Sequence, residues 1–282
     1  MPTTDLPRLE PDTSRTSAER PSTWRRVTTS SGLTPKTVAL PAAALLGLLA
    51  VWQLLSSQGV FNPIIVPPPS DIFSELVDLL QEGYFWRALR FTLLATVQGF
   101  VYGCLLGFVL GALVAEFSTF RTAVYPWIVL FQNMPRVALA PLFLTWFGFG
   151  VGSKIILAVT ICFVPVLVNT IVGLTSVSED SRTLLRSLGA TRWQVLRRLS
   201  LPTAAPSIMA GIKLGSTFSL LAVVIGEFLG STEGMGVLLT TFNFQLNIGA
   251  AFAVALVLAF VGLALYGLVA AVERRFIFWR ND

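Results

Sequence analysis

The chain has 282 residues, of which 54% are hydrophobic and 12% charged, about half the charged share of an ordinary soluble domain. With a mean hydropathy of +0.73, this composition excludes a water-soluble fold and a disordered chain, and it indicates an integral membrane protein. The net charge of +5 then favours Arg and Lys residues beside membrane spans over a surface that binds nucleic acid.

A polar segment precedes the predicted spans. Residues 1–36 are rich in Pro, Ser, Thr and Arg and lack an apolar period, so we expect a disordered cytoplasmic tail before a membrane domain of residues 37–282. Apolar stretches of 20 residues or more then recur, long enough to cross ~30 Å of hydrocarbon. They predict an all-α membrane protein with six transmembrane helices, at 38–57, 91–115, 122–153, 155–178, 199–226 and from near Gly249. Pro135 and Pro141 are expected to kink or break the third.

The distribution of Lys and Arg predicts the orientation. If the tail is cytoplasmic, fifteen basic residues lie inside the cell and three lie outside, namely Arg87, Arg90 and Lys154. Positive charge concentrates on the cytoplasmic side of membrane proteins, so we expect both termini inside. Lys213 lies near the inner end of the fifth span and is expected to extend its ammonium group to the interface.

An outside segment has a helical pattern of its own. After the prolines at 67–69, Ser70 or Asp71 can cap a helix whose apolar residues recur at helical spacing through Leu80. Its other face carries acidic residues. This pattern fits a helix that lies over the bundle in the interface, or a contact for an extracytoplasmic partner.

Glycines recur every four residues in the second span. Residues at this spacing share one face of a helix, and small residues let membrane helices approach closely. We expect the stripe to pack against another helix, either statically or as a smooth surface that can slide. Its members are Gly99, Gly103, Gly107 and Gly111, and Gly211 with Gly215 form a shorter copy in span five.

The cytoplasmic loop 178–202 predicts two short helices. Asp180 or Ser181 can cap the first, and Gly189 can end it. Thr191 with Gln194 fits a capping box for the second, which Pro202 is expected to terminate. The first helix has an apolar face beside arginines, which fits either a docking surface for another protein or packing onto the bundle. The leucines of that face are Leu184, Leu185 and Leu188.

The same loop carries a family resemblance. Gly189, nine further residues and the Leu-Ser-Leu-Pro of 199–202 resemble the EAA signature of bacterial ABC importer permeases, EAA-x3-G-x9-I-x-L-P. Thr183 stands where the signature has its glutamate, and Glu179, one turn earlier on the same face, can replace that charge. Segments similar to the sulfonate, taurine and nitrate subgroup are 67–71 (PPPSD), 135–142 (PRVALAPL), 146–150 (WFGFG), 154–155 (KI), 169–170 (NT) and 227–236 (EFLGSTEGMG).

The resemblance implies a type I importer permease in the bacterial inner membrane, surrounded by lipid. It implies a homodimer that binds two cytoplasmic ATPase subunits and receives its solute from an extracytoplasmic binding protein. ATP and Mg would be bound by the ATPase, because this chain has no phosphate-binding G-x4-GK[ST] motif and no cofactor site of its own. The residues expected to couple to the ATPase are Glu179, Arg182, Thr183, Leu184, Leu185, Arg186, Leu188, Gly189, Ala190, Arg192, Trp193, Leu201 and Pro202.

Three polar residues near the membrane are candidates for the substrate pathway. Arg136, at the break of the third span, can attract an anion, and Glu227, at the outer end of span five, can gate the pathway or face a partner. Asn169 of the fourth span completes the set. We expect a sulfonate, nitrate or similar small anion as the solute, with an aromatic acid or a thiamine- or riboflavin-type precursor as the alternative.

Two other classes of protein fit the sequence less well. An ion-coupled secondary transporter should show internal repeats and paired buried carboxylates, and neither pattern is found. A membrane-embedded enzyme lacks its usual groups, because the chain has no histidine and no Ser or Cys beside a plausible base. The two cysteines, Cys104 and Cys162, lie in apolar runs, so we expect no metal site and no disulfide.

Overall fold

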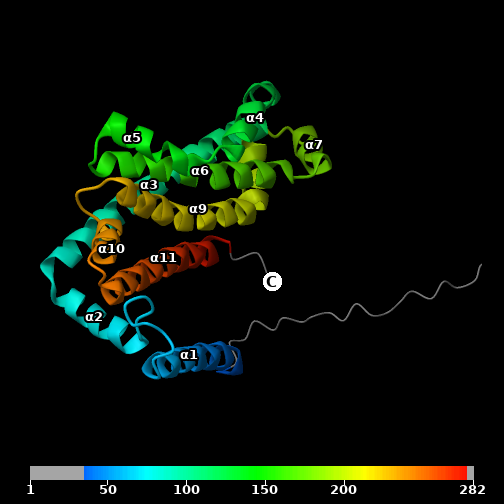
Figure 1. The fold of residues 1–282 in the computed structure, drawn as a ribbon. Helices are drawn as coiled ribbons and strands as arrows, with labels where there is room; N and C mark the ends of the chain where they lie inside the picture. The colour runs from blue at the N-terminus through cyan, green and yellow to red at the C-terminus, as the bar shows by residue number, and fades with distance from the viewer. Residues whose placement is uncertain (1–34, 278–282) are drawn as a thin grey trace, which may run out of the picture. The chain divides into compact units, whose positions relative to one another are not determined.

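The structure is a computed structural model that describes residues 35–277, and within that range it is helical with no strand (Figure 1). The predicted disordered tail lies almost wholly outside the described residues. The first described helix, α1, begins at Pro35. The first part of α1, up to Gly47, is a separate unit, and residues 48–277 belong to a second compact unit.

Five helices of the described part are long and apolar enough to cross a membrane. They are α1 (Pro35–Ser57), α3 (Gly83–Glu116), α6 (Val151–Thr175), α9 (Leu201–Leu229) and α11 (Ile248–Phe276). The predicted start of the last span, Gly249, lies one residue from the start of α11. Shorter helices connect these spans, namely α2 (Pro69–Gln81), α7 (Glu179–Ser187), α8 (Arg192–Val195) and α10 (Met235–Phe244).

The third predicted span is broken. α4 (Ser118–Asn133) is followed by the short η1 (Arg136–Leu139) and by α5 (Ala140–Phe147), and the two halves meet at 88°. Pro135 lies at the break, where Met134 has the extended backbone that a following proline favours. Counted as one broken span, the pair brings the number of candidate spans to six, as predicted.

The glycine stripe of α3 lies against α6. A Cβ atom at Gly99 would collide with the Cβ of Ala158, and one at Gly107 would collide with the carbonyl oxygen of Phe163. At Gly111 the added atom would lie 2.7 Å from the Cβ of Thr170. The glycines therefore bring the two helix backbones into direct contact, with no room for a methyl group between them.

An adjoining face of α6 packs on α9 by the same means. Gly211 would place a Cβ 2.7 Å from the Cβ of Asn169, and Gly215 would place one 2.9 Å from Sγ of Cys162. Figure 1 shows α6 and α9 side by side. Because Cys162 also lies against Gly103 of α3, glycines bring the three helices α3, α6 and α9 into close packing.

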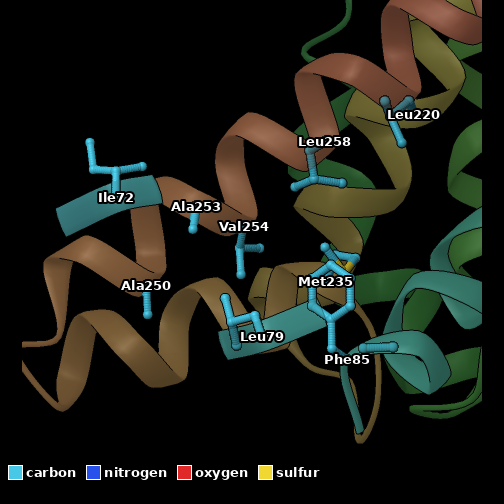
Figure 2. Close-up of a cluster of buried hydrophobic side chains, with 10 residues drawn as sticks. Ile72, Leu79, Phe85, Leu220, Met235, Ala250, Ala253, Val254 and Leu258 are labelled. Atoms are coloured by element: carbon cyan, nitrogen blue, oxygen red, sulfur yellow. The ribbon is translucent and has the colours of Figure 1, made fainter. Parts of the chain in front are cut away.

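A second buried cluster joins α2 to the end of the chain (Figure 2). Ile72 and Leu79 of α2 pack with Phe85, Met235 and Val254 from α3, α10 and α11. The predicted caps of α2 are wrong: its N-cap is Pro68, and no side chain caps the helix. The backbone N–H of Ser70 instead donates to Oε1 of Gln53, 3.1 Å away, so a residue of α1 satisfies a free donor of the first turn.

Arginines cap the carboxyl ends of two spans. Arg121 donates to the carbonyls of Val114 and Ala115 in the last turn of α3, at 3.1 and 2.7 Å. Arg182 donates to the carbonyl of Leu174 at the end of α6, at 2.7 Å. Both helices thus have cations beside carbonyl groups that lack a helical partner.

Lys213 has a partner that the sequence pattern did not indicate. Its ammonium group forms an ion pair with Glu273 of α11 and lies 5.9 Å from the centre of the Tyr266 ring. The expectation that this lysine extends to the interface stays a prediction. The ion pair links α9 to the last turn of α11, where two partly buried charges offset each other.

Candidate functional site

The first loop helix, α7, begins earlier than predicted. Its N-cap is Ser178, whose hydroxyl accepts a bond from the backbone N–H of Ser181 at 3.4 Å. Asp180 and Ser181, the predicted caps, lie in the first turn instead. Glu179 and Asp180 place negative charge beside the free N–H groups of that turn, which stabilises the helix start.

Gly189 ends α7 in the left-handed conformation, with φ of +82°. Its N–H donates to the carbonyl of Arg186 at 2.9 Å, and the N–H of Ala190 donates to the carbonyl of Leu185 at 3.0 Å. These two bonds form a Schellman motif, which satisfies carbonyls that the helix leaves free. The predicted role of Gly189 as the helix end is confirmed.

The second loop helix, α8, begins with the predicted capping box. The hydroxyl of Thr191 accepts from the N–H of Gln194, and the Gln194 side chain accepts from the N–H of Thr191. The predicted stop at Pro202 is wrong, because the chain passes through a π-helical segment, Leu196–Ser200, directly into α9. Pro202 has no backbone N–H to donate. The wider π turn directly before it changes the hydrogen-bond pattern there, so the helix continues past Pro202.

The outer surface of α7 and α8 exposes three large apolar side chains among polar ones. Leu188 is 75% exposed and Leu184 62%, and Trp193 of α8 is 66% exposed, whereas Leu185 is half-buried. A hollow of about 300 Å³ lies between the two helices, lined by Leu185, Leu188, Gly189, Ala190, Gln194 and Arg198. Exposed leucines in a segment held by three caps are typical of a docking surface.

The polar residues of the loop divide into two groups. Arg186 is exposed and lies 4.0 Å from Glu179, and Thr183 and Arg192 are exposed as well. Arg182 lies on the other side of α7, where it bonds the end of α6 and lies 3.7 Å from Glu116 of α3. With 11% of its side chain exposed, Arg182 attaches α7 to the bundle and does not belong to the outer surface. Leu201 and Pro202 are half-buried at the start of α9.

Two of the three predicted pathway residues share a cavity. Arg136 and Asn169 both line a space of about 480 Å³ bounded by α4, η1, α6 and α9. The Arg136 guanidinium donates to the carbonyl of Ile161 at 3.3 Å, and the Asn169 amide donates to the carbonyl of Pro165 at 2.8 Å. The sequence pattern did not indicate Gln132, the other polar residue of the lining.

Glu227 lies elsewhere, in the buried junction of α3, α9 and α10. Its carboxylate accepts from the hydroxyl of Thr92 at 2.8 Å and from the N–H of Gly236 at 2.7 Å. The Thr92 hydroxyl also accepts from the N–H of Met235. Only 2% of Glu227 is exposed, and it does not line the Arg136 cavity. The geometry gives it a structural role that joins three helices.

Lys154 holds the adjoining loops. Its buried ammonium group donates to the carbonyls of Phe149 and Gly230, both at 2.6 Å. Phe149 lies between α5 and α6, and Gly230 directly follows α9. Lys154 therefore joins these two connecting segments, and nothing in the local sequence pattern indicated this contact.

Solved structures show the same fold. A chain of the MetNI methionine ABC transporter in an inward-facing conformation superposes with a TM-score of 0.61 over 68% of this chain and 95% of that chain, at 17% sequence identity. The described helices therefore have the architecture of an importer transmembrane domain. A family model, the binding-protein-dependent transport system inner membrane component, matches residues 103–278. The chain belongs to this family and is the membrane-spanning permease component of an ABC importer, not an enzyme.

Several relatives align along most of the chain. The putative aliphatic sulfonates transport permease protein of Bacillus subtilis is 32% identical over 249 residues, 88% of each chain. The formylaminopyrimidine transport permease protein of Halalkalibacterium halodurans is 30% identical over 86% of this chain and 96% of its own length. The taurine transport system permease protein of Escherichia coli is 28% identical over 87% and 91%. The chain is thus similar to permeases named for different solutes, within one multi-pass inner-membrane family.

Proposed function

We propose that two copies of this permease form the translocation pathway, bind two cytoplasmic ATPase subunits through α7 and α8, and receive solute from an extracytoplasmic binding protein. ATP and Mg²⁺ would be bound by the ATPase subunits. The exposed Leu184, Leu188 and Trp193 carry the proposal, because apolar side chains gathered on two short loop helices are typical of an interaction surface.

The geometry of the loop fits the transfer of motion. The Ser178 cap and the Schellman motif set the two ends of α7, and the capping box sets the start of α8. Arg182 attaches α7 to the ends of α3 and α6, and the π segment joins α8 to α9 without a flexible connection. A displacement of α7 and α8 by a partner therefore reaches the packed helices directly.

Charge supports the proposed orientation. α7, α8 and the C-terminal turn of α11 hold Arg residues, whereas Arg87 and Arg90 at the start of α3 are two of the three basic residues assigned to the outside. The positive-inside bias supports cytoplasmic termini and a cytoplasmic α7–α8 surface, with α2 outside. Labelling a cysteine at Ser70 should therefore succeed with a membrane-impermeant reagent added outside the cell membrane.

The relatives' names support two solute classes. Permeases named for aliphatic sulfonates and taurine favour a small sulfonated anion. A permease named for formylaminopyrimidine supports the alternative, a vitamin precursor. We favour the anion, because an arginine lines the cavity among the spans.

One experiment tests the docking surface. The permease and its ATPase are co-expressed and purified through a tag on the permease, and the ATPase recovered is compared between the wild type and Leu184→Asp/Leu188→Asp. We expect loss of co-purification, because unpaired carboxylates would be buried at the interface centre. The control is Leu246→Asp, which changes a 69% exposed leucine between α10 and α11. Equal ATPase recovery from all three proteins would contradict the proposal.

A further inference from the structure

The cavity around Arg136 is an open groove along α6, since part of its lining, such as Val137, Phe218 and Leu221, is exposed on the described chain. Of its lining, Ile161 and Asn169 lie 10 and 18 residues after Val151 in a helix of 25 residues. At ~1.5 Å per residue, these positions lie roughly 15 and 27 Å from the start of α6. The cavity therefore extends from the middle of α6 toward its carboxyl end. A guanidinium at this depth is costly, and ionisable groups within spans usually serve a pathway or a ligand.

Arg136 has hydrogen-bonding capacity to spare. Its bond to the Ile161 carbonyl uses one of the five N–H groups of a guanidinium. The three ion pairs found within residues 35–277 involve other residues, so no carboxylate of the described chain neutralises it. A planar cation with free parallel donors is suited to bidentate binding of an oxyanion.

The break of the third span puts this arginine in place. Arg136 is the first residue of η1, directly after the 88° bend at Pro135. The bend turns the chain so that the guanidinium reaches the backbone of α6, 25 residues later in the sequence. A continuous helix through this region would instead keep Arg136 in the row of α4 side chains.

The rest of the lining is mostly apolar. Besides the amides of Gln132 and Asn169, the walls carry aliphatic and aromatic side chains, among them Val168, Phe218 and Ile225. The volume of about 480 Å³ lies within the range of sites for small organic molecules. A bare inorganic ion such as nitrate would leave most of this apolar space unfilled.

We infer that the cavity is a solute site within the permease itself, in which Arg136 binds the oxyanion head group of an organic anion and the apolar walls of α6 and α9 hold its body. This rests on the proposed function, in which the chain lines the pathway. The ligand class is a sulfonate or carboxylate attached to an apolar group. Selection by charge then occurs in the membrane component as well as in a binding protein.

The test uses the assembled importer, permease with its ATPase, in lipid nanodiscs without a binding protein. Equilibrium binding of radiolabelled pentanesulfonate, pentanoate and 1-pentanol is measured, with empty nanodiscs subtracted. We expect saturable binding of one or both anions and none of the alcohol. The two anions distinguish a sulfonate from a carboxylate solute, and either result supports the inference.

Variants test the role of Arg136. Arg136→Gln should weaken anion binding about tenfold or more, since a charge-assisted pair is lost, whereas Arg136→Lys should retain part of it. Val137→Lys adds a second cation to the same lining and should strengthen binding severalfold. The matched control is Arg87→Gln, which removes an exposed arginine at the start of α3 and should change nothing.

Three results would overturn the inference. One is equal binding of the alcohol and the anions, which would make the cavity merely apolar. Another is unchanged anion binding in both Arg136→Gln and Val137→Lys. The third is a wild type that binds neither anion. ATPase co-purification is scored in the same samples. If the wild type recovers no ATPase, the proposed function fails; if it recovers ATPase but binds neither anion, only the inference about the cavity fails.

Discussion

The contact between α3 and α6 differs from the surface of α7 and α8 in which residues form it and whether they are buried. In the first, glycines remove side chains so that two backbones touch, and every glycine of the stripe is buried. In the second, leucines point outward from helices whose ends are fixed by hydrogen bonds. The contact between α3 and α6 requires glycines, which have no side chain, whereas the surface of α7 and α8 consists of side chains that the rest of this chain leaves exposed.

The difference separates stability from coupling. Substitutions between α3 and α6 should act on the folded state, because most of the neighbouring atoms are backbone or Cβ atoms of α6, which cannot move aside without moving the helix. Substitutions on the outer face of α7 and α8 should leave the fold intact and act on partner binding. Each of the following variants tests this separation.

The largest effect is expected from Gly107→Leu. The new side chain would meet the carbonyl of Phe163 and lie 2.9 Å from the Cβ position of Val166, so α3 and α6 must separate. We expect a loss of roughly 3 kcal/mol or more of stability, measured as a fall in the detergent melting temperature or as loss of folded protein. The control, Gly267→Leu in α11, has nothing within 4 Å and should be tolerated.

Glu227→Leu should have the next largest effect. The change leaves the Gly236 N–H and the Thr92 hydroxyl without their acceptor in a buried junction. An unsatisfied buried polar group costs about 1–3 kcal/mol, so the melting temperature should fall clearly. Glu233→Leu, at an exposed position six residues later, serves as the control. Identical melting curves for the two variants would show that Glu227 does not join these helices.

Gly189→Val should affect coupling more than stability. A β-branched residue at φ of +82° is strained by about 1–2 kcal/mol, so α7 should lose its fixed end. We expect a folded permease that binds its ATPase weakly or fails to stimulate ATP hydrolysis in reconstituted membranes. Ala190→Val, at the next residue, lacks this conformational strain. If Gly189→Val matches it in ATP turnover, the angle of α7 is not set by Gly189.

Leu188→Ala should change stability least. The side chain is 75% exposed, so the melting temperature should stay within about 0.5 kcal/mol of the wild type. Partner affinity should nevertheless fall by ~2 kcal/mol if Leu188 is an interface anchor. Titration of the purified ATPase into permease nanodiscs measures this. A fall in stability without a change in affinity would contradict the claim that the surface of α7 and α8 acts on partner binding rather than on the fold.

Local patterns predicted local structure well. The spans, the break at Pro135, the capping box at Thr191 and the helix end at Gly189 each depend on residues within a few positions of one another. The glycine stripe was visible as a period, although its partner helix was not. The cap of α7 was misplaced because Ser178, Asp180 and Ser181 all have side chains that can cap, and the structure uses the first.

Contacts between distant segments could not be predicted from one sequence. Thr92 and Glu227 are 135 residues apart, and no periodicity connects them. Arg182 was expected to couple to the ATPase with the rest of its loop, whereas its guanidinium reaches a carbonyl of α6 and a carboxylate of α3. For the same reason Arg136 and Asn169 were separate candidates until the fold placed both on one cavity, and Glu227 away from it.

The arginines at the ends of α3 and α6 have a consequence for biosynthesis. Arg121 follows the last residue of α3 by five positions, and Arg182 follows that of α6 by seven. Each of these spans therefore carries the cap for its own carboxyl end in the next short stretch of chain. As the ribosome adds residues one at a time, such a helix can complete its terminal hydrogen bonds before later spans exist. In the proposed orientation, the same two arginines would also favour retention of these helix ends on the cytoplasmic side.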